Sequence, residues 1–447
     1  MVLGICNFYM LLFLKKFIPK PIFRLYHYLL AQAADFFYSS PADNLIVIGV
    51  TGTAGKSTVV YLISKILEKA GYKVGCSSTI MFKVDKKEWL NDKKMTMVGR
   101  FALQKLLKQM VSAQCQYAII EVTSQGIEQY RHLGVNFDVL VFTNLYPEHL
   151  EAHGGFENYK KAKLKLFAKL KDEAPKLIAG QKIKKTIIAN LDDEHANDFL
   201  QNWAEEKIGY ALTNNSTDLA RVVRAENPKA AAEGIEFFID RQRFFLPLLG
   251  RHNIGNVLAA VTLGLSQGLS LNSMAEGLYK FGGLPGRLEI INEGQPFALI
   301  VDYAFEPKAV LALYETAAHL AHQKIIHVLG SAGGGRDKAR RPILGKIAGE
   351  KADYVIVANE DPYDEDPQAI IDEVAEGAVS AGKVLDQNLF KILDRRQAIA
   401  KALSLAQAGD LVLVTGKGSE QAIAVGGGKL APWDDRQVVR EELGKIL

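Results

Sequence analysis

One segment, GVTGTAGKST at residues 49–58, restricts the fold of this chain more than any other feature. It follows the apolar, β-branched run 45–50 and precedes the helix-periodic run 56–69, so it joins a buried strand to a helix. Glycines let backbone N–H groups face phosphate oxygens, the helix N-terminus adds positive potential, Lys56 supplies a cation and the Ser57 hydroxyl can bind Mg²⁺. The predicted phosphate-binding residues are Gly52, Thr53, Ala54, Gly55, Lys56, Ser57 and Thr58.

The loop departs from the strict phosphate-loop pattern at one position, because Val50 stands where that pattern has glycine. The alternative is an ordinary glycine-rich turn between a strand and a helix, which is common in α/β proteins. The Gly-Lys-Ser-Thr ending favours the phosphate site, since a plain turn has no need of a lysine and a hydroxyl there.

The same alternation of strand and helix continues along the chain. Strands are expected at 118–122, 139–144 and 185–190, each followed by a polar loop or a helical pattern. Such connections give parallel strands with helices on both faces, so an α/β fold with a parallel sheet of the P-loop ATPase type is predicted. An antiparallel β-insert is expected between residues 209 and 249, before two helices.

A Gly/Pro-rich joint, FGGLPG at 281–286, precedes a second alternation of strands and helices. This part predicts a Rossmann-like α/β domain without a dinucleotide fingerprint. Three parts are therefore expected: a helical leader at 1–43, a central ATP-binding domain at 44–284 and a C-terminal domain at 285–447.

The leader differs from the rest of the chain. Residues 1–14 are almost wholly apolar, basic side chains follow as far as Arg24, and no acidic residue precedes Asp35. Aromatic and aliphatic residues then recur at helical spacing over 22–38, which is typical of a helix that lies in a membrane surface. Peripheral membrane contact through residues 1–40 is one interpretation, and packing on the next domain is the other. A signal peptide is disfavoured, because charged or polar side chains interrupt the apolar run.

Composition excludes several classes of protein. Apolar residues make up 48% and charged residues 23%, and 54 Lys+Arg face 50 Asp+Glu, which is typical of a folded globular chain and excludes a surface that coats nucleic acid. The three cysteines are too far apart in sequence to form a zinc or disulfide pattern, and no apolar run reaches the length of a membrane-spanning helix. We expect a cytoplasmic protein, with the inner face of the membrane as a possible place of contact.

Polar side chains follow two of the expected strands. Glu121 ends one strand at the edge where open α/β sheets bind ligands, and it could hold Mg²⁺. The segment 143–154 follows another strand and contains two acidic residues and two histidines. By itself this segment would be read as a solvated loop, but its expected place beside the phosphate loop favours a role in the site.

Eight motifs occur in an order that resembles the Mur ligase family, most closely its MurE branch. They are TGTAGKS at 51–57, EVTS at 121–124, TNL with HL at 143–150, YKKAK at 159–163, NLDD at 190–193, GRHNIGN at 250–256, GRLE at 286–289 and VDYA at 301–304. The resemblance runs from about Leu45 to the C-terminus.

The resemblance implies ATP-dependent formation of an amide bond. A substrate carboxylate attacks the γ-phosphate, the acyl phosphate is taken by an incoming amine, and ADP and phosphate leave. Such an enzyme must neutralise charge between two anions and exclude water from the acyl phosphate. ATP and Mg²⁺ are the implied cofactors, and a muramoyl peptide and an amino acid are the implied substrates.

The resemblance also assigns roles to residues of the ATP and metal sites. Lys56 and Ser57 would hold the phosphates and the first Mg²⁺, Glu121 would bind that metal, and His149 would bind a second. Lys163 matches a lysine that the family carbamylates into a metal ligand; an ordinary surface lysine is the alternative, since three other lysines surround it. The remaining nucleotide contacts would be Asn253, Asn256, Arg287 and Asp302.

Further matches concern the two substrates. The muramoyl-peptide contacts would be Thr96, Thr123, Gln129 and Arg131. The contacts to the incoming amino acid would be Arg336, Glu360, Asp361, Pro362, Tyr363, Gly416 and Glu420.

Three departures from the family pattern bear on specificity. The diaminopimelate-reading Asp-Asn-Pro-Arg aligns with EDPY at 360–363, so Tyr363 replaces an arginine that would clamp a carboxylate. FEP at 305–307 replaces His-Thr-Pro at the hinge. About forty residues precede the phosphate-loop strand, so the UDP-binding domain that MurE proteins carry is expected to be absent.

These departures keep other functions open. The first expectation is a ligase that adds an amino acid to a muramoyl-peptide precursor of peptidoglycan. The same chemistry on a lipid-linked acceptor, as in MurT-like ligases, or on a folylpolyglutamate-type acceptor is the second. A nucleotide-binding scaffold without catalysis is the third.

Overall fold

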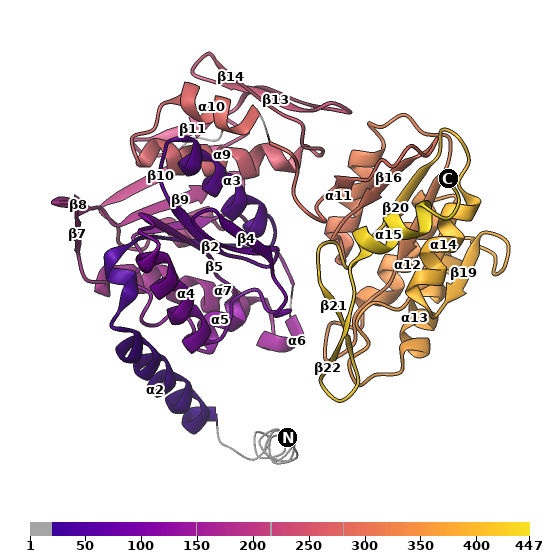
Figure 1. Cartoon of the computed structure of the whole chain (residues 1–447), viewed down its shortest axis with the longest axis horizontal. Helices are drawn as coiled ribbons and strands as arrows, with labels where there is room; N and C mark the ends of the chain where they lie inside the picture. The colour runs from indigo at the N-terminus through magenta and orange to yellow at the C-terminus, as the bar shows by residue number, and fades with distance from the viewer. Residues whose placement is uncertain (1–19, 149, 215–216, 280) are drawn as a thin grey trace.

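The computed structural model describes residues 20–148, 150–214, 217–279 and 281–447. Figure 1 shows two α/β units side by side, each with a sheet between helices, and helix α2 (Lys20–Tyr38) below the first unit. The predicted α/β class is confirmed. Residues 1–19, where part of the predicted membrane contact falls, and His149 lie outside the described residues.

The first unit is built on a nine-stranded sheet that is parallel from β11 to β2 and closes with the antiparallel pair β3–β4. The phosphate-loop strand β1 lies in the middle. In spatial order the strands are β11 (Val222–Arg224), β10 (Glu206–Ala211), β9 (Thr186–Asn190), β6 (Val139–Phe142), β1 (Ile46–Thr51), β5 (Tyr117–Glu121), β2 (Val74–Ser77), β3 (Met81–Val84) and β4 (Lys87–Leu90).

Alternate residues of β1 enter two different cores, because helices cover both faces of the sheet. Ile48 and Val50 pack under one layer, whereas Val47 packs under the other. The first layer consists of α3 (Lys56–Lys69), α9 (His252–Ser266) and α10 (Leu271–Tyr279). The second consists of α4 (Arg100–Ser112), α5 (Ser124–Glu128), α7 (Phe156–Ala168) and α8 (Ala196–Leu200).

The expected antiparallel insert is present but begins later than predicted. It contains β12 (Glu226–Ala231), β13 (Gly234–Ile239) and β14 (Gln242–Leu246). The prediction that it starts at Gly209 was wrong, because Gly209 lies in β10 and pairs in parallel with Ala189 of β9. The neighbours of Gly209 in β10, Ile208 and Tyr210, are buried in the main core, so the polar alternation there was misleading.

The second unit has a six-stranded sheet that is parallel except for its edge strand β15. The strands in order are β15 (Glu289–Ile290), β16 (Ala298–Val301), β20 (Leu411–Val414), β17 (Ile325–Leu329), β18 (Tyr354–Ala358) and β19 (Leu389–Ile392). One face carries α11 (Pro307–Ala317), α12 (Arg340–Lys351) and α13 (Pro367–Ser380). The other carries α14 (Arg395–Leu405) and α15 (Asp435–Leu443).

Short elements complete the chain. They are the 3-10 turns η1 (Pro41–Asn44) and η2 (Lys169–Asp172), helix α6 (Leu150–His153), and the hairpins β7 (Lys176–Ile178) with β8 (Gln181–Ile183) and β21 (Ala422–Val425) with β22 (Lys429–Pro432). Leu284 belongs to the first core and Leu288 to the core of the second unit. We propose residues 284 and 285 as the boundary between them, as the sequence predicts.

Helix α2 has two apolar faces. Ala31 and Ala34 are fully buried against the first unit, so packing on the following domain does occur. The opposite side exposes apolar residues at helical spacing: Ile22, Leu25, Tyr26, Leu29 and Phe36. Among the described residues, no helix is both long enough and apolar enough to cross a membrane.

Candidate active site

The carboxyl ends of both sheets line one cavity of about 620 Å³ between the two units. Loops after β1, β5 and β6 form one wall, and loops after β16, β17, β18 and β20 form the other. This is the edge at which open α/β sheets bind ligands. Of the residues predicted from the sequence, the cavity is lined by Thr53, Ala54, Gly55, Lys56, Ser57, Thr58, Thr96, Glu121, Thr123, Arg131, Asn253, Asn256, Arg287, Asp302, Arg336, Glu360, Asp361, Tyr363, Gly416 and Glu420.

The phosphate loop is held in shape by the strand beside it. The Thr53 N–H donates to the Asn144 carbonyl oxygen at 2.9 Å, and the Ala54 N–H donates to Asn144 Oδ1 at 2.8 Å. Gly52 does not line the cavity but fits where no side chain could, because a Cβ there would lie 1.9 Å from Thr143 Oγ1. Gly55 has a φ of +79° and precedes α3, so the loop ends at a helix N-terminus, where an anion is stabilised.

Lys56 lies in the cavity wall with its ammonium held over the loop. Nζ donates to the Thr53 carbonyl oxygen at 2.7 Å. Burial lowers the pKa of Lys56, and the carboxylates of Glu121 and Glu306 oppose this effect. The side chain is therefore positioned to exchange a backbone carbonyl for phosphate oxygens when a nucleotide binds.

Ser57 and Glu121 form the candidate magnesium site. Ser57 Oγ donates to Glu121 Oε2 at 2.7 Å, and the Glu121 side chain is buried. The Thr79 N–H and hydroxyl also donate to this carboxylate, at 2.7 and 3.1 Å. A hydroxyl and a carboxylate are the hard oxygen donors that Mg²⁺ prefers, and Mg²⁺ takes few protein ligands beside water and phosphates, so these residues fit the ion.

The sequence did not single out Thr79. It follows β2, whose place next to β5 in the sheet brings its carboxyl end beside Glu121. Thr79 Oγ1 also donates to Thr96 Oγ1 at 2.8 Å, which connects the predicted metal ligand to a predicted substrate residue. Only the strand order could have shown this link, because the two segments are not adjacent in the chain.

Lys163 is buried, unlike Lys161 and Lys165 beside it in α7, so the alternative of an ordinary surface lysine is wrong. Its Nζ donates to the Gly52 carbonyl oxygen at 2.8 Å and lies 4.7 Å from the centre of the Tyr159 ring. Burial and the nearby Lys56 ammonium hold the pKa of Lys163 well below its usual range. The neutral amine, which is the form that reacts with carbon dioxide, is therefore favoured.

The predicted second-metal ligand His149 lies outside the described residues. Within the part of the chain that the structure describes, no three His, Cys, Asp or Glu side chains gather into a metal site.

The predicted nucleotide residues lie at the start of α9 and at the hinge. Asn256 Nδ2 donates to Asn253 Oδ1 at 2.7 Å, and a Cβ on Gly55 would lie 2.3 Å from Asn256 Oδ1, so α9 begins against the phosphate loop. Asp302 accepts hydrogen bonds from the N–H groups of Leu288 and Ala304, both at 2.7 Å, which fixes the hinge. Arg287 stacks on the ring of Tyr303 at 4.1 Å.

The departure FEP at 305–307 places a further carboxyl group in the cavity. Burial and the neighbouring carboxylate of Glu148 raise the pKa of Glu306 to about 8. Arg340 NH1 lies 3.8 Å from Glu148 Oε1, so cationic and acidic groups of both units meet here. The sequence signal for Glu306 was its deviation from the family pattern.

The predicted muramoyl-peptide residues cluster around α5. Thr123 caps this helix by accepting a hydrogen bond from the Gly126 N–H at 3.0 Å. Gln129 does not line the cavity; its Oε1 accepts from Arg131 at 2.6 Å and thereby holds that guanidinium, which also donates to the Met97 carbonyl oxygen. Arg131 lines the cavity and so places a cation on this wall.

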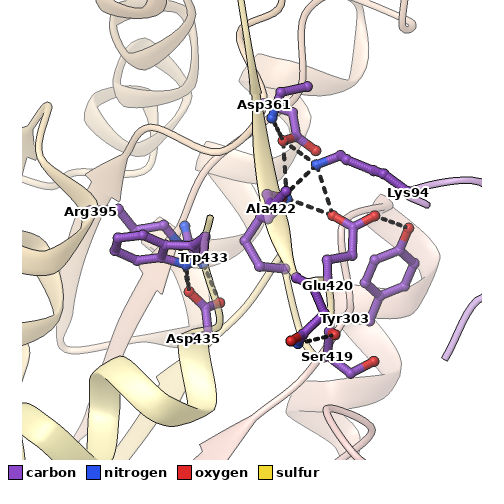
Figure 2. A network of polar contacts seen from close by, with 12 residues as sticks. Lys94, Tyr303, Asp361, Arg395, Ser419, Glu420, Ala422, Trp433 and Asp435 are labelled. Carbon is purple, nitrogen blue, oxygen red and sulfur yellow. Dashed lines mark hydrogen bonds and ion pairs between the residues drawn. The ribbon is translucent and has the colours of Figure 1, made fainter. Parts of the chain in front are cut away.

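The predicted amino-acid residues follow β18 and β20. Asp361 and Glu420 share the buried ammonium of Lys417, at 3.0 and 2.6 Å. Tyr303 donates to Glu420 Oε1 at 3.2 Å (Figure 2). Pro362 does not line the cavity.

Four other predicted amino-acid residues line this wall: Arg336, Glu360, Tyr363 and Gly416. A Cβ on Gly416 would lie 2.4 Å from Glu360 Oε2, so only glycine fits there. Tyr363 has a left-handed φ of +53°, and Tyr363 and Tyr303 help to raise the pKa of Arg336 above its ordinary value, although burial alone would lower it. The sequence missed Lys94, which belongs to the first unit yet binds both Asp361 and Glu420 (Figure 2).

Comparisons with known proteins agree with this geometry. Residues 50–264 match the Mur ligase middle domain, and residues 286–418 match the Mur ligase, glutamate ligase domain. The chain is 38% identical over 425 residues to a UDP-N-acetylmuramyl-tripeptide synthetase of Roseiflexus sp. (strain RS-1), covering 93% of this chain and 82% of the relative. It is 33% identical to the UDP-N-acetylmuramoyl-L-alanyl-D-glutamate--2,6-diaminopimelate ligase of Clostridium tetani, covering 93% and 81%.

Solved structures share the arrangement of the two units. A UDP-N-acetylmuramoyl-L-alanyl-D-glutamate--2,6-diaminopimelate ligase superposes with a TM-score of 0.58 at 28% identity, over 90% of this chain and 79% of that chain. The folylpolyglutamate synthase of Mycobacterium tuberculosis superposes with a TM-score of 0.68 at 16% identity, over 90% and 97%, which shows the fold alone. With both family domains matched in order and a relative at 38% identity over most of its length, the chain belongs to the Mur ligase family.

Proposed function

We propose that this Mur ligase adds an amino acid to a muramoyl-peptide precursor of peptidoglycan, through an acyl phosphate formed with ATP. Family membership carries the class of reaction, an ATP-dependent, ADP-forming acid–amino-acid ligase. The observation that supports the assignment of the site is the single cavity that joins the phosphate loop to Asp361 and Glu420 on the opposite wall. The phosphoryl donor, the substrate carboxylate that it phosphorylates and the incoming amine can thus meet in one cavity.

ATP is proposed to bind on the first unit. The N–H groups of the loop and the N-terminus of α3 would face its phosphates, Lys56 would neutralise their charge, and Asn253 and Asn256 would lie on the adenine side. Arg287 and Asp302 approach from the hinge, so nucleotide binding would connect the two units.

Ser57, Glu121 and carbamylated Lys163 are proposed to hold Mg²⁺. The bound ion would supply charge neutralisation between the substrate carboxylate and the phosphate. When neutral, the buried Lys163 amine can add carbon dioxide and release one proton, and the resulting carbamate presents oxygen atoms in place of a cation. The lowered pKa of Lys163 supports this role, because a protonated lysine cannot form a carbamate.

The muramoyl peptide is proposed to lie along α5, where Arg131 and Thr123 line the cavity beside the candidate metal site. Arg131 would orient a carboxylate toward the γ-phosphate, and its own contacts to Gln129 and to the Met97 carbonyl oxygen hold it in place. The opposite wall would deliver the amine. Enclosure between the two units would keep water from the acyl phosphate.

The decisive experiment measures phosphate release by the full chain with ATP, Mg²⁺, UDP-muramoyl-dipeptide and a panel of amino acids. We expect release that requires both the peptide and an amino acid. The Lys56→Met variant is the control for contaminating ATPases. No release above that control with any amino acid would contradict the proposal and would favour a nucleotide-binding scaffold.

One observation favours a lipid-linked acceptor as a second candidate. The outer side of α2 exposes Leu25 and Leu29, each 56% exposed, together with Phe36 at 87%. Such a helix, with basic residues and no acidic residue before Asp35, suits an anionic membrane surface. We propose peripheral contact with the inner face of the cytoplasmic membrane through residues 1–40.

Flotation of the full chain with vesicles of phosphatidylglycerol and phosphatidylcholine tests this contact. We expect wild-type protein to float and the Leu25→Ser, Leu29→Ser double variant to remain at the bottom. The Ile343→Ser variant, which changes an exposed apolar residue of the second unit, should float like wild type. Equal flotation of both variants, or none by wild type, would contradict membrane contact through α2.

A further inference from the structure

Lys94 reaches from the first unit into the wall that receives the amino acid. It stands in the turn between β4 and α4, far in sequence from the motifs of the second unit. Its ammonium contacts the Asp361 carboxylate, Glu420 Oε2 at 3.2 Å and the Ala422 carbonyl oxygen at 2.9 Å (Figure 2). Three acceptors therefore match the three N–H donors of this ammonium.

The turn that carries Lys94 is braced. Asn91 is buried, and its side-chain amide donates to the carbonyl oxygens of Ser78 and Met95, at 2.7 and 3.1 Å, while its Oδ1 accepts from the Lys93 N–H at 2.9 Å. Lys94 itself has a φ of +48° and a side chain that is only 9% exposed. The conformation of the turn therefore sets the direction of the Lys94 side chain.

Lys417 completes a cluster in which two ammonium groups face two carboxylates. Lys417 is fully buried and binds both Asp361 and Glu420. Burial alone would raise the pKa of Asp361, but the two lysines lower it below its usual range. The cluster is formally neutral, and each carboxylate already accepts from both lysines, so it offers no net attraction to a further cation.

We propose that Lys94 is a specificity-determining residue that excludes a side-chain ammonium, so that the incoming amino acid is one without a second amino group. The proposal rests on the function proposed above and specifies its amino acid. Lys94 occupies the acceptors Asp361 and Glu420 with a cation that the protein itself supplies.

The physical reason is competition for the same oxygens. An ammonium brought by a substrate would have to displace Lys94, which would leave a buried cation without its partners, or share the carboxylates and give the cluster a net positive charge. Both outcomes are costly where water is excluded. An incoming amino acid with an uncharged side chain incurs neither free-energy penalty.

A second departure at this wall points the same way. An amino acid with both a carboxylate and an ammonium at the far end of its side chain needs a cation clamp as well as an acidic acceptor. The position where the family pattern has an arginine is Tyr363 here, whose φ of +53° turns the chain away from an extended path. At Asp361, Glu420 and position 363 the wall therefore provides neither a carboxylate without a lysine partner nor an arginine. Arg336 remains on this wall as a cation, and Glu360 remains as a carboxyl group whose pKa burial raises, which favours its uncharged form.

The test compares amino acids of three classes with the full chain: uncharged, acidic, and dibasic such as lysine and diaminopimelate. We measure kcat/KM for each with wild type, Lys94→Met and Lys93→Met. Met keeps the length of the Lys94 stem and removes its charge. Lys93 is exposed, pairs only with the neighbouring Asp92 and does not line the cavity, so it is the matched control.

We expect wild type to prefer uncharged amino acids and Lys94→Met to raise kcat/KM for lysine by at least about tenfold, with the KM for ATP unchanged. Lys93→Met should behave as wild type. A wild-type preference for lysine, or an equal loss for all amino acids in Lys94→Met, would overturn the proposal.

A binding measurement separates this inference from the proposed reaction. Calorimetric titration of lysine into wild type and Lys94→Met, with a non-hydrolysable ATP analogue present, should show tighter binding to the variant by about tenfold. If no acceptor supports phosphate release but this difference in binding is found, the proposed function fails and the role of Lys94 stands. Equal affinity for lysine would overturn the role of Lys94 whatever the turnover.

Discussion

The two walls of the cavity are built in different ways. The phosphate-binding part of the first wall comes from one contiguous segment, residues 53–58, between the end of β1 and the start of α3. The amino-acid wall is assembled from residues far apart in the chain, among them Lys94, Tyr303 and Asp361. The contiguous loop takes shape within the first unit, whereas the second wall, with Lys94 in it, is complete only when both units are in place.

The same contrast holds for charge. On the phosphate side, Lys56 lines the cavity and the buried Lys163 lies behind it against the Gly52 carbonyl oxygen, and burial lowers the pKa of both lysines. The amino-acid wall instead pairs two lysines with two carboxylates. Lys56 on the first wall thus donates to a backbone carbonyl oxygen, whereas both lysines of the second wall are paired with carboxylates.

Lys56→Met should have the largest effect. Removing the cation that faces the phosphates should lower the rate of phosphate release by about a thousandfold. Thermal unfolding should change little, because Nζ contacts only a backbone carbonyl that solvent can also reach. Lys69→Met, at the other end of α3, is the control. A thousandfold loss accompanied by unfolding would mean that the loop is not independently formed, and the contrast between the walls would fail.

Lys417→Met should destabilise the second unit by about 3 kcal/mol, because it leaves two buried carboxylates to the single ammonium of Lys94. Denaturant unfolding of the full chain measures this change. Lys429→Met, which alters an exposed lysine of the neighbouring hairpin, should leave the stability unchanged. A loss of activity without loss of stability would show that Lys417 acts on a ligand, as proposed for Lys56, and that its pairing with Asp361 and Glu420 does not stabilise the fold.

Lys163→Met should reduce phosphate release by about a hundredfold and abolish any dependence of the rate on added bicarbonate. The folded-state pKa of Lys163 is lower than that of a lysine in the unfolded chain, near 10.4. Burying this side chain therefore costs no stability above that pH, and the cost grows as the pH falls, because the unfolded chain then binds a proton that the folded state binds less well. The variant should therefore unfold at a higher temperature than wild type at pH 7.

Lys161→Met, an exposed lysine of the same helix, is the control for the Lys163 variant. A wild-type rate that does not respond to bicarbonate after removal of dissolved carbon dioxide would exclude carbamylation. A Lys163→Met enzyme with unchanged activity would remove this residue from the metal site altogether.

Glu306→Gln should have the smallest effect. The difference in free energy of unfolding between wild type and this variant should change with pH. The folded-state pKa of Glu306 is raised to about 8, so its stabilising contribution is complete below the unfolded pKa near 4.5 and is lost as the pH rises through 8. Wild type and variant should be equally stable near pH 4.5. At pH 8 the variant should be more stable than wild type.

Denaturant midpoints at several pH values measure this difference, with Glu315→Gln, an exposed residue of the same helix, as the control. A pH profile identical to that of wild type would show that Glu306 is not held in a proton-sharing contact between the units. The hinge would then be electrostatically independent of the phosphate wall.

Much of the fold followed from local patterns. The run 56–69 was predicted as a helix and is α3 with those same limits, because helical periodicity and the glycine before it act within one segment. The insert was placed too early, at Gly209, because polar alternation in β10 reads like an antiparallel strand, whereas its parallel partner β9 is set by the sheet as a whole. Pairing between distant strands leaves no local signature.

The site divides in the same manner. The sequence by itself determined the phosphate loop, the α/β alternation and the family motifs, since each depends on residues that are neighbours in the chain or recur in a fixed order. Only the tertiary structure decided that Lys163 is buried and its neighbours are not, that Thr79 stands beside Glu121, and that Lys94 fills the opposite wall. Burial and charge pairing arise from contacts between segments that the chain brings together on folding, and those contacts set the chemistry of the amino-acid wall.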